Sequence, residues 1–243
     1  MPTVDKFSDL VRSRRSIRDF RPTPIPADVL DALLEDANAS PSWSNTQPYR
    51  VAIASGPLRD KLAEQLTARF TAGMQAQRAG WLGKLKLITT QRYVLPDGDF
   101  ATNFAYPEDL QPQRRDTGHK LYQLLGIGRK DHAAREAQMR RNFEFFGAPT
   151  ALFVFVHSGL REFSVLDAGI FTQTLMLSAH ARGLGTCAQG ALATWAGPVR
   201  EAFDVPPNYK LICGISLGYP SDHPVNQFNP GRAAAVKLRL PLL

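Results

Sequence analysis

The chain has 243 residues, of which 44% are hydrophobic, and its 29 Lys and Arg against 22 Asp and Glu give a formal net charge of +7. This length allows one large domain or two small ones with a sizeable core. Acidic residues are interspersed among the basic ones, which excludes a nucleic-acid-binding tail and fits an anionic cofactor or substrate about as well as DNA or RNA.

The location expected from the sequence is the cytoplasm. The first residues lack the charged and apolar regions of a secretory signal peptide. The longest apolar run, at 151–156, has the length of a strand and not of a membrane span. Cys187 and Cys213 lie far apart in apolar segments, so we expect two buried, free thiols.

Hydrophobic periodicity predicts the elements, beginning with a short amphipathic segment that carries Phe7, Leu10 and Val11. Helices are expected at 27–39, 57–79, 114–125, 131–145, 165–182 and about 197–203, and strands at 49–54, 151–156 and 210–217. The helix at 165–182 is apolar almost all round, so protein must cover it, and a second subunit could do so. The alternation of Val236, Leu238 and Leu240 with basic residues predicts an edge strand in the tail.

Regularity fades from about 80 to 113, where prolines and glycines are frequent. The aromatic residues of this stretch are Trp81, Tyr93, Phe100, Phe104 and Tyr106. Because they need cover, we expect an excursion over the body of the protein and not a linker. The predicted organisation is a single domain at 1–243 with a variable helical and loop excursion at about 75–145.

Several familiar motifs are absent or fail on inspection. Gly214 to Gly218 reads G-x-S-x-G, but two prolines follow where a hydrolase nucleophile elbow needs a helix, so a strand end is expected. There is no G-x-G-x-x-G and no Walker loop. The five histidines and two cysteines lack ligand spacing, so no metal site is expected. Asp97-Gly98-Asp99 is interpreted as a turn.

Four polar clusters have the composition of a site for a phosphate and a flat ring. Guanidinium groups bind phosphate oxygens in a bidentate way, and a serine adds a short donor. The clusters are Arg14, Arg15, Ser16 and Arg18; the stiff, donor-rich loop Ser40, Pro41, Ser42, Trp43, Ser44 and Asn45; the segment Thr186 to Gly190, where Gln189 and Gly190 offer main-chain donors; and Arg232. A solvated basic turn is the alternative for the first cluster.

Taken in order, these segments resemble the FMN-dependent nitroreductase family over nearly the whole chain. The matching residues are Arg14 to Arg18 with Phe20; Pro24-Ile25-Pro26 with Leu30, Leu33 and Leu34; Ala39 to Ser42 with Asn45, Gln47 and Pro48; Phe146 to Pro149; Asp167-Ala168-Gly169 with Gln173; Gly183 to Cys187; and Gly214 to Pro220.

The resemblance implies an α+β, nitroreductase-like fold with a central, mostly antiparallel sheet flanked by helices. It implies an intertwined homodimer, with FMN at the subunit interface and the tail wrapped onto the other subunit. Arg14, Arg15, Ser16 and Arg232 would hold the phosphate and ribityl chain, with Arg18 near the flavin N1/O2 edge. Pro41, Ser42, Trp43, Ser44 and Asn45 would reach the flavin from the second subunit. Gln189 and Gly190 would lie against the ring.

The implied activity is electron transfer from NAD(P)H through FMN to a nitroaromatic, a quinone or a similar flat acceptor, in a ping-pong sequence. No catalytic protein residue is required, and aromatic side chains at 81–106 with Tyr122 could shape the acceptor pocket. The excess of basic over acidic residues hints at an anionic acceptor such as a nitrobenzoate. The alternatives are another reaction on the same flavin fold, such as reductive dehalogenation, flavin destruction or dehydrogenation, or a non-catalytic basic binder of nucleic acid or anionic surfaces.

Overall fold

The computed structural model describes residues 4–81, 83, 85, 89, 95–102 and 104–240. Its strands are β1 (Tyr49–Ser55), β2 (Thr150–His157), β3 (Gly185–Gln189) and β4 (Tyr209–Gly218). They form one sheet in the order β1-β2-β4-β3, and every neighbouring pair is antiparallel. The expected α+β fold with an antiparallel central sheet is therefore confirmed.

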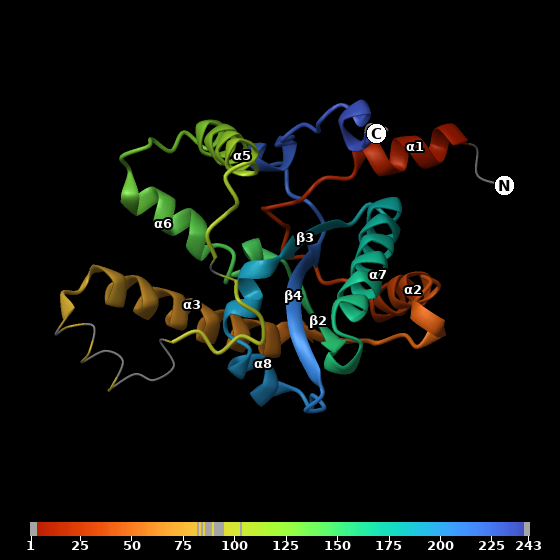
Figure 1. Cartoon of the computed structure of the whole chain (residues 1–243), viewed down its shortest axis with the longest axis horizontal. Helices are drawn as coiled ribbons and strands as arrows, with labels where there is room; N and C mark the ends of the chain where they lie inside the picture. Colours follow the sequence, from red (N-terminus) through yellow and green to blue (C-terminus); the bar gives the residue numbers. More distant parts are fainter. Residues whose placement is uncertain are drawn as a thin grey trace.

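Helices cover both faces of this sheet (Figure 1). The buried residues of α2 (Ala27–Asn38) and α7 (Glu162–Ala181) pack on one face, and those of α3 (Gly56–Arg78) and α8 (Gly197–Ala202) pack on the other. Three further helices, α1 (Val4–Ser13), α5 (Gln111–Leu124) and α6 (His132–Arg140), lie outside these layers. None of the helices in the described part of the chain is long and apolar enough to cross a membrane.

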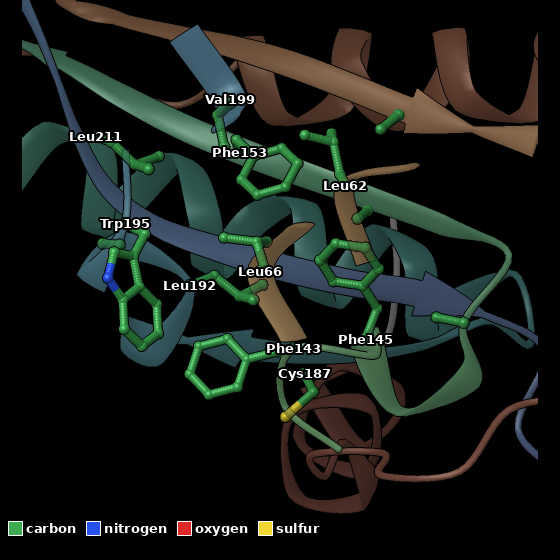
Figure 2. Close-up of a cluster of buried hydrophobic side chains, with 14 of the residues drawn as sticks. Leu62, Leu66, Phe143, Phe145, Phe153, Cys187, Leu192, Trp195, Val199 and Leu211 are labelled. Atoms are coloured by element: carbon green, nitrogen blue, oxygen red, sulfur yellow. The ribbon is translucent and has the colours of Figure 1, made fainter. Parts of the chain in front are cut away.

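Strand β2 is buried on both faces because its apolar side chains alternate between two cores. Leu152, Val154 and Val156 point toward α2 and α7, whereas Phe153 and Phe155 point toward the opposite core. Figure 2 shows Phe153 in that second core, together with Leu62 and Leu66 of α3 and with Phe143, Phe145 and Trp195. The run at 151–156 is thus a central strand, as predicted.

Three sequence-based expectations about secondary structure were wrong. The tail at Ala235–Leu238 is an exposed 3-10 turn and not an edge strand. The helix expected at 131–145 ends at Arg140, residues 141–144 form turns, and Phe145 and Phe146 adopt positive φ angles of 54° that exclude a helix there. Trp81, Gly83, Leu85 and Thr89 are helical, although they fall in the stretch expected to be irregular. Strand β3 was not expected, since it is short and its residues lack a hydrophobic alternation.

Asp97-Gly98-Asp99 is more than a turn. The Asp97 carboxylate pairs with Arg69 of α3 at 2.8 Å, and the Asp99 carboxylate pairs with Arg200 of α8 at 2.8 Å. Asp99 also accepts the main-chain N–H of Leu211 in β4 at 2.7 Å. The three residues therefore form a clasp that fastens the excursion to α3, α8 and the sheet.

Candidate cofactor site

The arginine-rich segment after α1 runs along the outer edge of β3. Ser16 forms a parallel bridge with Thr186, and the Ile17 N–H donates to the Thr186 carbonyl at 2.9 Å. Phe20 forms a second, antiparallel bridge with Pro220. The segment is thus held beside the strand that leads to Gln189 and Gly190.

The side chain of Asn226 joins this segment to the C-terminal part of the chain. Its amide oxygen accepts the N–H groups of Arg18 and Asp19, at 2.8 and 3.2 Å. Its amide nitrogen donates to the carbonyls of Asp19 and Ser221, at 2.8 and 3.0 Å. Asn226 is buried, and the Asp19 carboxylate is paired with Arg141 at 2.8 Å. Both segments are therefore fixed relative to one another.

A cavity of about 390 Å³ lies where the two segments meet, within the size range of small-molecule sites. It is lined by all the residues of the first predicted cluster and by Arg232, which comes from the other end of the sequence. Thr117 of α5 and Phe228 complete one wall, and the Arg18 guanidinium lies 5.7 Å from the centre of the Phe228 ring. The structure thus brings together Arg14, Arg15, Ser16, Arg18 and Arg232.

The cavity carries positive charge that no carboxylate neutralises. Within the described part of the chain, none of its guanidinium groups forms an ion pair; they belong to Arg12, Arg14, Arg15, Arg18 and Arg232. The Nε of Arg14 is buried and has no hydrogen-bond partner among the described residues. Burial first, and the nearby charge of Arg232 second, lower the pKa of Arg14. A bound dianion would relieve both the repulsion and the missing bond, so the residues fit a phosphate.

A second cavity of about 430 Å³ lies on the other side of Arg14 and Arg15 and includes His180 of α7. The His180 ring is hydrogen-bonded to the Ser13 hydroxyl at 2.8 Å. Burial, followed by the charges of Arg14 and Arg15, lowers the pKa of His180. Sequence reasoning missed His180. The lowered pKa of its imidazole reflects, in part, the positive charge of the arginine cluster.

The loop at 40–45 is held by several contacts, but it does not line the arginine-rich cavity. The Trp43 N–H donates to the Asp167 carboxylate of α7 at 3.0 Å, and the Trp43 ring packs on Phe163 with 4.3 Å between ring centres. Ser44 and Asn45 adopt φ angles of 48° and 55°. These contacts place the loop at the N-terminal end of α7.

The loop and the arginine cluster therefore lie at opposite ends of α7. Asp167 holds the loop, whereas His180, thirteen residues further along the helix, lies beside the cluster. At 1.5 Å per residue, thirteen residues span about 20 Å. One chain does not bring Pro41, Ser42, Trp43, Ser44 or Asn45 to the cavity, so they could join it only from a second copy.

Gln189 and Gly190 lie at the end of β3. Gly190 is exposed, and a Cβ atom added there would meet nothing within 4 Å. Gly190 lies four positions after Thr186, the residue that pairs with Ser16. Four positions along a strand span about 13 Å. The Gln189 side chain is buried and points inward, where its amide nitrogen donates to the Asn142 carbonyl at 2.9 Å. Of this pair, Gly190 faces open space.

Among the described residues, the aromatic side chains expected to line an acceptor pocket line neither cavity, and Phe100 packs instead against the core beside α2 and α7. Trp81, Phe104 and Tyr106 are exposed, and Tyr93 lies outside the described residues. The Tyr122 ring is covered by the guanidinium of Arg135 at 4.5 Å. In the described part of the chain, no group of three or more His, Cys, Asp or Glu is placed to hold a metal ion.

Comparison with known proteins gives consistent matches over most of the chain. The model of the nitroreductase family matches residues 11–219. A 4-nitrobenzoate reductase from Nocardioides sp. is 32% identical, over 93% of this chain and 85% of the relative. Nitroreductase NfnB from Mycolicibacterium smegmatis is 34% identical, over 91% and 87%. The crystal structure of an FMN-dependent nitroreductase NfnB from Mycobacterium smegmatis in complex with NADPH superposes with a TM-score of 0.82, at 31% identity, covering 98% of both chains.

Proposed function

The chain belongs to the nitroreductase family, and on that basis we propose that it is an FMN-dependent oxidoreductase that passes electrons from NAD(P)H to nitroaromatic acceptors. The observation that carries this proposal is the cavity of unpaired guanidinium groups with the partnerless Nε of Arg14. FMN, when bound, supplies the two-electron chemistry, which is why no acid, base or nucleophile is needed in the protein.

The residues of the cavity have distinct roles in this proposal. Arg14, Arg15, Ser16 and Arg232 hold the phosphate and the ribityl chain. Arg18, at the Phe228 wall, provides the cation for the N1/O2 edge, where negative charge grows on reduction. The main chain of Gln189 and Gly190 lies against the ring, in the open space in front of Gly190.

We further propose that the active form is a homodimer in which the loop at 40–45 of each copy completes the site of the other. The position of this loop supports this arrangement, because its Trp43 is held at Asp167, and α7 runs about 20 Å from there to His180 beside the arginine cluster. Large apolar side chains are also exposed in three places: Val4 and Phe7 on α1, Trp43 in the loop, and Phe163 and Leu166 on α7. A second copy would cover them.

The acceptor that we propose is a nitroaromatic acid. The formal charge of +7 favours an anionic substrate, and relatives from Nocardioides sp. and Pseudomonas putida are named 4-nitrobenzoate reductases. The two free cysteines suit the reducing cytoplasm, which we propose as the location.

The test begins with the visible spectrum of the purified protein, which should show flavin bands at near-stoichiometric occupancy. Oxidation of NADH and NADPH is then followed with 4-nitrobenzoate, with neutral nitrobenzene and with a quinone. A higher kcat/KM for the carboxylate, falling as ionic strength rises, supports the anionic acceptor. A colourless protein that does not bind added FMN would refute the proposed function.

A further inference from the structure

The G-x-S-x-G sequence of β4 forms a lane of small residues on one face of the sheet. Gly214 pairs with Gln189 and Ser216 pairs with Cys187, so their side-chain positions share that face. A Cβ atom added to Gly214 would lie 2.4 Å from the Leu192 side chain, which therefore fills the space that glycine leaves. Ser216 is the one member of the lane with a functional group, and it is completely buried.

The Gln189 side chain crosses this lane diagonally to reach Ser216. The Ser216 hydroxyl donates to the Gln189 amide oxygen. The Gln189 amide nitrogen donates to the carbonyl and to the side-chain oxygen of Asn142, at 2.9 and 3.3 Å. The hydrogen-bonding groups of the amide are thus engaged in the interior, on the side away from the open space in front of Gly190.

We propose that Ser216 is a positioning residue of the cofactor site, which acts by keeping the Gln189 side chain out of the space that the flavin ring occupies. This inference rests on the proposed binding of FMN at Gly190. Without the hydroxyl, the amide oxygen of Gln189 loses its donor, which is costly for a buried acceptor. The side chain then turns outward, where water can satisfy it, and FMN must displace it again in order to bind.

The test compares FMN affinity in apoproteins by quenching of flavin fluorescence. Ser216→Ala is expected to raise the Kd for FMN about tenfold while the melting temperature of the apoprotein changes little. The decisive variant is the double substitution Ser216→Ala/Gln189→Met, in which no amide is left to turn outward. It is expected to bind FMN within about twofold of Gln189→Met alone.

Thr150→Val serves as the matched control, because it removes another buried hydroxyl from the same sheet, one that is bonded to Ser55 at 2.9 Å. Its Kd should equal that of the wild type. Unchanged FMN affinity in Ser216→Ala, or an additive loss in the double variant, overturns the positioning role while leaving the proposed function intact. Failure of the wild-type apoprotein to bind FMN overturns both. If Ser216→Ala alone is too unstable to study, a difference of more than about twofold between the Kd values of Gln189→Met and the double variant still overturns the positioning role.

Discussion

The amide side chain of Asn226 is bonded through both its oxygen and its nitrogen to the main chain of Asp19, 207 residues earlier in the sequence. Asp19 follows the arginine-rich segment directly, and Asn226 precedes Phe228 and Arg232. This buried amide therefore helps to fix the relative position of the two halves of the anion cavity, together with the bridge between Phe20 and Pro220.

Asn226→Asp replaces the amide nitrogen, a donor to two carbonyls, with an oxygen that repels them. We expect the free energy of unfolding to fall by about 2 kcal/mol and FMN affinity to fall with it. Thermal denaturation of the apoprotein measures the first effect. Asn229→Asp is the control for stability, since its oxygen accepts the Gly231 N–H at 3.0 Å in either form. Equal melting temperatures for both variants would contradict the role of Asn226.

Removing Arg14 and Arg232 together should strip the cofactor. Each charge-assisted hydrogen bond contributes about 1.5–3 kcal/mol, so Arg14→Ala/Arg232→Ala is expected to raise the Kd for FMN at least about 100-fold. Fluorescence titration measures the loss. The pair Lys61→Ala/Lys130→Ala removes the same formal charge from exposed positions outside the cavity lining and should retain FMN. Full flavin occupancy in the arginine variant would exclude the phosphate assignment.

An acidic residue on the exposed face of α7 should split the dimer. Leu166 is 57% exposed in the single chain, and Leu166→Asp would place a charge in the proposed interface. Sedimentation velocity is expected to show monomers, and their flavin content should drop because the second 40–45 loop is lost. Met139→Asp changes an exposed apolar residue of α6 and should remain dimeric. A flavin-loaded monomer of the wild type would disprove the shared site.

His180 should sense the phosphate. The pKa of this imidazole is lowered in the folded protein, so the unfolded chain binds more protons there. The corresponding stability is complete above about pH 6.5 and is lost as the pH falls through the folded-state pKa. A bound phosphate opposes the field of Arg14 and Arg15 and should raise the pKa of His180. NMR titration with and without FMN tests this shift, with His180→Gln assigning the signal; a shift downward would place the anion elsewhere.

Neither thiol should react in the native protein. Burial raises the pKa of Cys213 to about 11 and also raises the pKa of Cys187, despite opposing effects from Arg18, Arg14 and a hydrogen bond with Ser16. The thiolate is the reactive form, so alkylation at pH 8 should label neither residue before unfolding and both afterwards. Mass spectrometry counts the adducts, and rapid native labelling would contradict the burial of Cys187 and the raised pKa of Cys213, which is half-buried.

The sequence predicts the elements that carry a strong hydrophobic period, because local burial patterns determine them. Helices α2 and α3 are of this kind, whereas the helix α7 and the strand β2 are predicted from continuous apolar runs. Strand β3 forms because it pairs with β4, a partner distant in sequence. The 3-10 turn at 235–238 pairs with no strand among the described residues. Hydrophobic periodicity encodes neither. The arginine cluster and Arg232 were both found from composition, and the family resemblance assigned them to one phosphate. The role of Asn226 as the clamp of the site, and the lining residue His180, follow only from the folded arrangement.

The clasp at Asp97-Gly98-Asp99 has an evolutionary consequence. It ties the chain to α3, α8 and β4, so the stretch before it could be lengthened, shortened or exchanged without breaking these contacts. A lineage could therefore acquire new acceptors by remodelling that stretch while it inherits the flavin scaffold unchanged.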